Sequence, residues 1–495
     1  MAHSAILTET IARHTRVLTD STNSSLNRRP IYGSHRKWTA ALAIVLAVAL
    51  YLTGLTRMGM YSTDEPRYAD IGRAMAQSGD WITPRLWGEP WFEKPALLYW
   101  MTAAGFKAGL GTDLAPRLPV ALLSVAFLAF FHFRLRHIFD ERVANYATAI
   151  LATTAGWLAY SHVAVTDLPV SAFFSMAVLL SLGRSPNRAA TAFALGLAVL
   201  AKGVPPVILF VPILALDYRN WRRWFAAWPI IVFLAVALPW HIIGTLRNGW
   251  QFPYILLIQQ QFGRFFSDSL QHEQHWWFYG PVFLLLLFPW FPLLPLAFRS
   301  ANDDERTRPL VAVVAFGLVF FSLSVNKLPG YVLPLVPATC VLMGGALGRT
   351  ARPERWLIAP VALLGALPLA TSVLPEAASQ GLMHSGRIPW ITGAAGMAVA
   401  AGVGVALAFW VRSRAFAVAV LLTAAGFVWV ETGIFPALDR AASARTLWSA
   451  NHPGCGPVLP RGMLWGLYYY SGKRLPDCAI VDKNAVKSDR SPQTH

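Results

Sequence analysis

The chain has 495 residues, of which 55% are hydrophobic and only 14% are charged. A soluble domain carries about 25% charged residues, so this composition excludes an ordinary soluble protein. The formal net charge is +17, but the basic residues stand in short segments between apolar runs. This distribution indicates orientation in a membrane, with membrane lipids as the surroundings, and argues against nucleic acid as a partner.

Residues 1–37 are polar and without periodicity, and we expect a disordered cytoplasmic tail there, with no cleavable signal peptide. From residue 38 the chain contains long apolar runs, and a bilayer core of ~30 Å takes about 20 helical residues. Only helices or closed barrels satisfy their backbone groups in lipid, and continuous runs favour helices. The thirteen predicted spans have the approximate limits 38–56, 114–133, 143–160, 168–183, 189–202, 204–217, 225–245, 277–297, 309–325, 330–348, 356–374, 389–411 and 415–435.

Alternate loops between these spans are basic, and this alternation predicts the orientation of the chain. The basic loops contain Arg28, Arg29, Arg36 and Lys37; Arg134, Arg136 and Arg142; Arg184 and Arg188; Arg219, Arg222 and Arg223; Arg299, Arg306 and Arg308; Arg349, Arg352 and Arg355; and Arg412 and Arg414. By the positive-inside rule these loops and the N-terminus face the cytoplasm, and thirteen spans place the C-terminus outside. The apolar stretch 189–217 is divided at Lys202–Pro206 because the alternation then stays in phase.

The largest loop of the opposite set, residues 57–113, carries several polar motifs. Tyr68, Ile71 and Met75 recur there at helical spacing, which predicts one or two short amphipathic helices in the membrane interface. The stretch Ser62–Tyr68 (STDEPRY) is typical of a helix start. A capped helix is also a rigid way to present a carboxylate, so a helix start and a catalytic site are compatible interpretations.

Four further motifs lie at span ends on the same face. They are Trp91–Pro95 (WFEKP), Thr166–Pro169 (TDLP), Asn326–Tyr331 (NKLPGY) and the pair Arg264-Phe265 with His272. Alone, each has a structural explanation, such as an interfacial ion pair, a helix N-cap or a turn whose lysine reaches the interface. Together the motifs bring two carboxylates, three lysines and an arginine to one face. Ionisable groups at span ends are costly unless they are paired or used.

This mixture of groups suits a phosphate-bearing lipid. Cationic side chains hold phosphate oxygens by charge-assisted hydrogen bonds, and the candidates are Lys94, Lys202, Arg264 and Lys327. Negative charge grows on the bridging oxygen as a glycosidic bond to phosphate breaks, and Lys94 and Arg264 are expected at that point. Asp64 and Asp167 could hold a sugar or activate an acceptor.

The combination and order of these motifs resemble the lipid A 4-amino-4-deoxy-L-arabinose transferases, within the wider group that includes protein O-mannosyltransferases. The matching stretches are Asp64–Ala69, Ser78–Trp81, Phe92–Pro95, Asp167–Pro169, Lys202-Gly203, Arg264-Phe265, His272, Trp277–Tyr279 and Lys327–Pro334. The resemblance covers roughly residues 38–345. It implies an all-α polytopic membrane protein with a GT-C fold, thirteen transmembrane helices and interfacial helices in the first periplasmic loop.

The predicted spans make residues 38–435 the transmembrane catalytic domain, followed by a periplasmic segment, 436–495, that is shorter than the resemblance leads us to expect. The resemblance also implies the substrates. The donor would be a sugar, 4-amino-4-deoxy-L-arabinose or a similar one, on undecaprenyl phosphate. The acceptor would be lipid A or another amphiphilic acceptor at the periplasmic face of a Gram-negative inner membrane.

On this resemblance Asp64 is the principal catalytic carboxylate, with Asp167 and Glu65 as further catalytic residues. The residues expected to bind the donor phosphate are Lys94, Arg67, Lys202, Arg264, Lys327 and Tyr331, and those expected to support them are Glu93 and His272. A Glu-His pair is expected shortly before Arg264, where Gln260-Gln261 stand instead. Whether a divalent cation is bound is therefore left open, and no other cofactor is assigned.

Two alternative functions and the role of Asp64 remain open. A polyprenyl-phosphate-sugar transferase acting on protein or another glycan would use the same groups. A lipid-sugar transporter would show inverted repeats and ionisable residues near mid-membrane, and the sequence shows neither. We expect a single displacement with inversion. Asp64 would orient a phosphate acceptor or steady the oxocarbenium-like centre, and it would act as a general base toward a hydroxyl acceptor.

The segment after the last span contains Cys455 and Cys478, which we predict to form a disulfide. The periplasm is an oxidising compartment, and about sixty residues are too few to build a large core unaided. Residues 468–470 and 479–481 are expected to form short strands that bring the two cysteines together. Cys340 lies in an apolar run and is expected to be inert packing.

Overall fold

The computed structural model describes residues 45–60, 62–183, 186–263, 274–301, 304–364 and 415–478. The chain divides into two compact units, Met1–Val48 and Ala49–His495. Only residues 45–48 of the first unit are described, and they are helical. The second unit holds all the features discussed below, and its described residues contain a single two-stranded sheet among many helices.

The loop of residues 57–113, called the first polar loop below, contains two helices joined by a short hairpin. Its elements are α3 (Asp64–Ser78), β1 (Arg85–Leu86), β2 (Glu89–Pro90) and α4 (Leu97–Lys107). The two strands are antiparallel, with Leu86 opposite Glu89. Tyr68, Ile71 and Met75 are buried along α3. The amphipathic helix predicted from their spacing is therefore confirmed, and it begins within the STDEPRY stretch.

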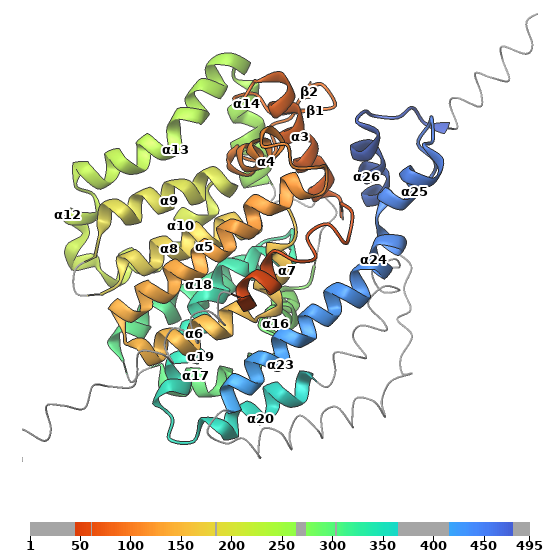
Figure 1. Ribbon diagram of the computed structural model, residues 1–495. Coiled ribbons are helices and arrows are strands. Elements are labelled where there is room, and N and C mark those ends of the chain that lie inside the picture. Colours follow the sequence, from red (N-terminus) through yellow and green to blue (C-terminus); the bar gives the residue numbers. More distant parts are fainter. Residues whose placement is uncertain are drawn as a thin grey trace, which may run out of the picture. The chain divides into compact units, whose positions relative to one another are not determined.

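A group of helices follows and forms much of the body (Figure 1). They are α5 (Leu114–Ile138), α6 (Glu141–Ala152), α7 (Ala155–Ser161), α8 (Asp167–Ser181), α9 (Arg188–Lys202), α10 (Pro205–Leu209), α11 (Val211–Leu216), η1 (Tyr218–Asn220), α12 (Trp221–Trp224) and α13 (Ala227–Asn248). Helix α9 packs between α8 and α13, and α8 also packs on α5. The break predicted after Lys202 is present, because Gly203 adopts φ +91° and Pro205 and Pro206 start a new helix.

The second half of the chain contains more interrupted helices. They are α14 (Gln251–Pro253), the π-helix η2 (Tyr254–Gly263), η3 (Trp276–Phe278), α16 (Tyr279–Leu286), η4 (Phe291–Leu293), α17 (Leu294–Ser300), η5 (Glu305–Thr307), α18 (Arg308–Leu323), η6 (Pro329–Leu335), α19 (Val336–Arg349), α20 (Pro353–Leu364), α23 (Ala415–Trp429), the π-helix η8 (Val430–Ile434), α24 (Phe435–Ala442), α25 (Ala444–Asn451) and α26 (Arg461–Ser471). Cys340 is a buried free thiol in α19, as expected. Packing of α19 against α6 and α17 places that helix in the interior.

Several described helices are long and apolar enough to cross a membrane. Five pass this test within the described part of the chain, namely Leu114–Ile138, Ala227–Asn248, Glu305–Leu323, Pro329–Arg349 and Phe416–Arg440. A sixth is added if the pair Trp276–Leu286 and Phe291–Ser300, bent by 106°, counts as one span. The protein is thus a mostly helical, multi-pass membrane protein. The span predicted at 389–411 lies outside the described residues.

The segment that follows α24 differs from the sequence prediction in its secondary structure. Tyr468–Tyr470 belong to helix α26 rather than to a strand, and the residues 479–481 lie outside the described part. Aromatic residues favour strands, but packing overrides this preference. Leu467 and Tyr469 are fully buried in α26. The predicted disulfide is confirmed, since Cys455 and Cys478 are bonded across a separation of 23 residues.

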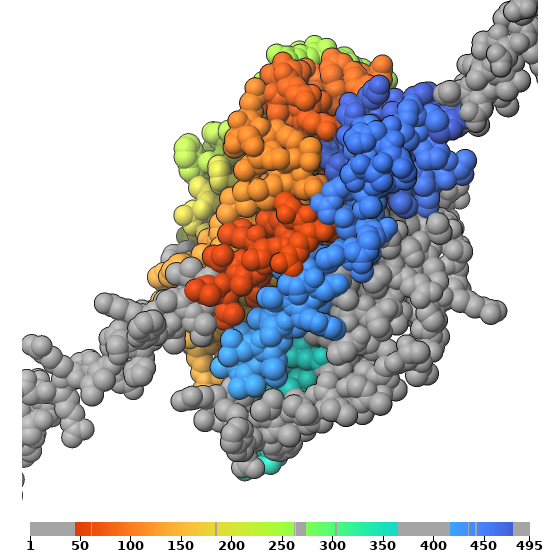
Figure 2. All heavy atoms as spheres, turned by 45° about the vertical axis from the view of Figure 1, so that its right-hand side comes forward, coloured from red at the N-terminus to blue at the C-terminus, as the bar shows by residue number. Residues whose placement is uncertain are grey.

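The C-terminal segment, defined here as residues 443–478, packs against the first polar loop. Helix α26 contacts α3 directly, and Figure 2 shows the blue atoms of this segment against the orange atoms of the loop. The Tyr470 hydroxyl donates to Asp113 Oδ1 at 2.7 Å, and Arg73 donates to the Tyr469 carbonyl at 2.9 Å. Two regions far apart in the sequence therefore form one structural unit around α3.

Candidate functional site

A fully buried ion pair fixes the start of α3. The Arg117 guanidinium donates from Nε and Nη2 to the two carboxylate oxygens of Glu65, each at 2.7 Å, and neither side chain is more than 2% exposed. Arg117 also donates to the carbonyls of Leu55 and Gly59, both at 2.8 Å. Glu65 further accepts from the Ala164 amide at 2.9 Å. Such a pair is stable only when every charge is compensated, and here the compensation is extensive.

This geometry gives Glu65 a structural role, in contrast to the catalytic role expected from the sequence. Its carboxylate joins the first polar loop to α5 and to the segment before α8, and it has 0% exposure. Glu65 therefore cannot contact a donor or an acceptor directly in this structure. Arg117 was missed in the sequence, although a lone arginine at the polar-loop end of a span was a signal for it.

Arg67, one turn into α3, joins two acidic groups. Its guanidinium donates to Asp64, to Glu93 Oε2 at 2.6 Å and to the Thr63 carbonyl at 2.9 Å. Burial by itself lowers the pKa of Arg67, but Glu93 and Asp64 outweigh this effect and raise the pKa, so the guanidinium stays charged. The Lys94 ammonium lies 3.5 Å from Glu93 Oε1. The two motifs STDEPRY and WFEKP are thus connected by ion pairs.

Asp167 and Lys202 form a second ion pair where α8 begins and α9 ends. Lys202 Nζ lies 2.5 Å from Asp167 Oδ1 and 4.8 Å from the centre of the Tyr331 ring. Gly330 lies so close that an added Cβ would approach Asp167 Oδ1 to 2.1 Å and the Tyr160 hydroxyl to 2.9 Å. A side chain is therefore excluded at Gly330, and Tyr160 belongs to the same cluster.

The two carboxylates expected to act in catalysis differ from Glu65 in their exposure. The side chain of Asp64 is 30% exposed and that of Asp167 is 15% exposed. Both groups remain accessible, unlike Glu65. The place of Tyr160 in this cluster was not predicted from the sequence, because a tyrosine at the end of an apolar run is more often an interfacial anchor.

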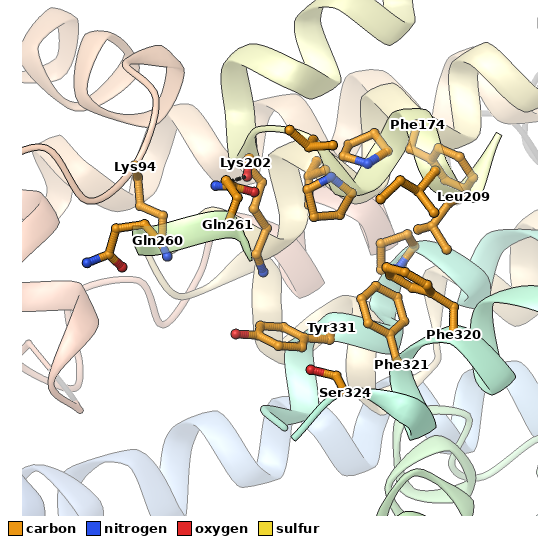
Figure 3. Close-up of a pocket in the computed structure, with 17 residues that line it drawn as sticks. Lys94, Phe174, Lys202, Leu209, Gln260, Gln261, Phe320, Phe321, Ser324 and Tyr331 are labelled. Carbon is orange, nitrogen blue, oxygen red and sulfur yellow. Dashed lines mark hydrogen bonds between the residues drawn. The ribbon is translucent and has the colours of Figure 1, made fainter. Parts of the chain in front are cut away.

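A cavity of about 190 Å³ opens beside these ion pairs. One end of it is polar and the other end is apolar (Figure 3). Lys94, Lys202, Gln260, Gln261 and Tyr331 line the polar end, and the apolar wall consists of residues such as Phe174, Leu209, Phe320 and Phe321. Asp64 and Asp167 are not among the lining residues. Asp167 pairs directly with the lining residue Lys202, whereas Asp64 is connected to the lining residue Lys94 through Arg67 and Glu93. The shape suits an amphiphile with an anionic head.

Two glutamine side chains at the polar end were not assigned a role from the sequence. Gln261 Nε2 donates to the Lys202 carbonyl at 3.3 Å and packs against Gly203. Gln260 Oε1 is buried and has no hydrogen-bond partner within the described ranges. Both residues lie in the π-helix η2, and such helices often occur at functional sites. A ligand that donates a hydrogen bond would satisfy Gln260.

Lys327, Arg264 and His272 complete the set of predicted site residues. Lys327 Nζ donates to the carbonyls of Ser324 at 2.5 Å and Gln274 at 2.9 Å, and burial lowers the pKa of its ammonium. It is not among the cavity-lining residues and its contacts lie in the turn before η6, so its role in binding phosphate stays a prediction. Arg264 and His272 lie outside the described residues. Within the described part, no three His, Cys, Asp or Glu residues gather in a metal-binding group.

The chain is similar in sequence to bacterial arabinosyl transferases. No family model matches it. It is 31% identical over 339 residues to the undecaprenyl phosphate-alpha-4-amino-4-deoxy-L-arabinose arabinosyl transferase of Pseudomonas aeruginosa, covering 64% of this chain and 61% of that protein. The protein of the same name from Pectobacterium atrosepticum is 29% identical over 367 residues, covering 68% and 65%. The chain thus spans about 61% of the length of the first relative.

The fold is similar to that of solved structures of ArnT from Cupriavidus metallidurans. The structure bound to undecaprenyl phosphate matches with a TM-score of 0.73 and 24% identity over 90% of this chain and 91% of that chain. The apo structure matches with a TM-score of 0.70 and 23% identity over 91% of each chain. The resemblance inferred from the motifs, and the GT-C fold it implied, are confirmed.

Proposed function

Because the chain is ArnT-like in both sequence and fold, we propose that it is a glycosyltransferase that moves a sugar from undecaprenyl phosphate to lipid A. The sugar is 4-amino-4-deoxy-L-arabinose or a close relative. The arabinosyl transferase activity is that of a relative similar in sequence, and the bound undecaprenyl phosphate is that of a protein similar in fold. The observation in this chain that carries the proposal is the cavity that joins two lysine ammonium groups to an apolar wall.

The donor would occupy this cavity with its phosphate at the polar end. Lys94 would hold phosphate oxygens by charge-assisted hydrogen bonds, while the prenyl chain lies along Phe174, Phe320 and Phe321. Lys202 would contribute from its place between Asp167 and Tyr331. Arg264 stays in the proposal as a further phosphate ligand because it follows directly after η2, which lines the cavity.

In the reaction, an acceptor oxygen forms a bond to the anomeric carbon while the bond from that carbon to the donor phosphate breaks. The released undecaprenyl phosphate keeps the electron pair, and Lys94 offsets the charge that grows on its oxygen. A phosphate acceptor is already ionised, so Asp64 would orient it and steady the positive charge at the sugar ring. A single displacement of this kind inverts the anomeric configuration.

The proposal includes the orientation of the chain in a bacterial inner membrane. Thirteen spans, with the N-terminus in the cytoplasm, would place the site and the C-terminal segment in the periplasm. The disulfide supports this placement, since disulfides persist in oxidising compartments. Cysteines placed near Arg222 should be protected from impermeant thiol reagents in intact cells, and cysteines near Gln251 should be labelled. The reverse pattern would overturn the orientation.

A transfer assay in vesicles tests the function directly. Purified protein would be reconstituted with undecaprenyl phosphate-linked aminoarabinose and lipid A, and the products analysed by mass spectrometry. The proposal predicts lipid A that is heavier by one sugar residue. Release of undecaprenyl phosphate with unmodified lipid A would indicate another acceptor, and an intact donor in the presence of folded protein would refute transferase activity.

A further inference from the structure

The C-terminal segment reaches the ion pairs of Arg67 with Asp64 and Glu93 through one aromatic side chain. We propose that Trp465 is a positioning residue, which holds the Arg67 guanidinium in the plane needed to bind Asp64 and Glu93. The inference rests on the proposed transferase function and assigns a role in it to a segment outside the membrane-spanning body. Trp465 is not itself a catalytic residue, because it acts through Arg67.

The Arg67 guanidinium lies close to three aromatic rings and also donates hydrogen bonds to the carboxylates of Asp64 and Glu93. Its central carbon lies 4.3 Å from the centre of the Trp465 ring, 5.9 Å from that of Trp91 and 5.7 Å from that of Tyr68. A planar guanidinium stacks with its face on an aromatic ring while its N–H groups donate in the plane. Fixing the plane therefore fixes the directions in which Arg67 donates to the two carboxylates.

Trp465 is itself held by groups from the same neighbourhood. Trp87, in the turn between β1 and β2, meets it edge to face with ring centres 5.8 Å apart, and the Arg461 guanidinium lies 4.6 Å from its ring. Trp87 also meets Tyr468 edge to face at 5.2 Å. The position of Trp465 is thus determined jointly by α26 and by the hairpin of the first polar loop.

The disulfide fixes the ends of the loop that contains α26. Cys455 precedes the helix and Cys478 follows it. Beside the bond, the Gly456 amide donates to the Pro476 carbonyl at 2.7 Å, and the Cys478 amide donates to the Gly456 carbonyl at 3.3 Å. The crosslink holds α26 against α3 in a segment that has only a small core of its own.

A pair of tryptophan variants separates positioning from general packing. Trp465→Leu removes the ring over Arg67 and keeps an apolar side chain. Trp448→Leu is the matched control, because Trp448 packs on the same small core, with its ring tilted against that of His452 at 4.8 Å between centres. Among the described residues, the rings over Arg67 are those of Tyr68, Trp91 and Trp465. Trp465→Tyr restores an aromatic face. All variants would be compared in the vesicle assay, with thermal unfolding measured in detergent.

We expect Trp465→Leu to lower kcat about tenfold, the change that corresponds to roughly 1.4 kcal/mol, with little change in the donor KM. Trp465→Tyr should recover most of this loss, and Trp448→Leu should stay within about twofold of wild type, since it leaves the ring over Arg67 in place. Equal losses in Trp465→Leu and Trp448→Leu, or unchanged kcat in Trp465→Leu, would overturn the inference.

The assay also distinguishes failure of the inference about Trp465 from failure of the proposed function. If wild-type protein transfers sugar but the tryptophan pair behaves alike, only the inference about Trp465 fails, whereas an inactive wild type refutes the proposed function. If Trp465→Leu does not fold, Trp465→Met is compared with Trp448→Met, and the same difference in kcat is expected. Combining Trp465→Met with Arg67→Lys should then lower kcat by less than the product of the two separate losses, because both changes act on the same guanidinium site, and losses that multiply would contradict the inference.

Discussion

Asp64 and Glu65 are neighbours in the sequence, yet they belong to two regions with opposite properties. Glu65 lies in the buried anchor, defined as the Glu65–Arg117 pair and its main-chain partners, where it is 0% exposed. Asp64 lies at the cavity head, defined as Asp64, Arg67, Glu93, Lys94, Asp167 and Lys202, and its side chain is 30% exposed. Both regions are networks of charged groups.

The two networks differ in whether their charged groups are fully enclosed by protein partners or border a cavity. In the buried anchor, each nitrogen of the Arg117 guanidinium and each oxygen of the Glu65 carboxylate has a hydrogen-bond partner in the protein. At the cavity head, the pairs border a space that has one polar and one apolar end. The anchor thus holds the first turn of α3 in place, and under the proposed function this rigidity would position Asp64 toward the substrates.

The largest expected effect comes from breaking the anchor. Arg117→Met leaves the Glu65 carboxylate buried without its counter-charge, which costs about 3 to 5 kcal/mol. We expect loss of most folded protein and a strongly lowered Tm in detergent. Arg136→Met is the control, because Arg136 pairs with Glu141 at 3.7 Å and both side chains are solvent-accessible. If the Arg117 variant matched this control in stability, the account of the anchor would be wrong.

Asp64→Asn should separate the two regions most cleanly. The change is nearly isosteric and leaves Glu65 untouched, so stability should stay close to wild type. Transfer should fall by roughly 10²- to 10³-fold, the range for loss of one group that stabilises charge in the transition state. The measurement is the initial rate in vesicles at equal protein level. Near-full activity would remove Asp64 from the mechanism.

Lys94→Ala should affect the donor more than the acceptor. Hydrogen bonds to charged groups contribute about 1.5 to 3 kcal/mol, so the donor KM should rise roughly ten- to hundredfold. Arginine should rescue only in part, because its planar fork differs from an ammonium group in reach and geometry. Kinetics with varied donor and fixed lipid A provide the readout. A changed acceptor KM with an unchanged donor KM would reverse the assignment.

Gln260→Leu should have the smallest effect of the series. Its buried Oε1 has no partner within the described ranges, so replacing it should leave stability unchanged or slightly higher. If a donor hydroxyl or ammonium group binds there, the donor KM should rise by a few-fold. Gln259→Leu, exposed on the same π-helix, is the control. Equal KM values in the two variants would exclude Gln260 from sugar binding.

The sequence was informative about local structure and about which motifs face one another. The helix start at Asp64 agrees with the acidic residues and the proline of its first turn, although Thr63 makes no side-chain capping hydrogen bond. The break after Lys202 follows from glycine and proline signals that act over a few residues. The pairing of Glu65 with Arg117 could not be predicted, because the partners are 52 positions apart and the sequence does not show which acidic residue a lone arginine at a span end will contact. Helix α26 was mistaken for a strand for a similar reason, since tertiary packing decides the state of an aromatic run.

The most direct test of the central claim is the lipid A of living cells. A Gram-negative host that makes the undecaprenyl phosphate-linked sugar but lacks its own transferase would express this protein or its Asp64→Asn variant at equal levels. Mass spectrometry should show lipid A heavier by one sugar residue with the wild-type protein and unmodified lipid A with the variant. Unmodified lipid A in both strains, or equal modification in both, would contradict the account.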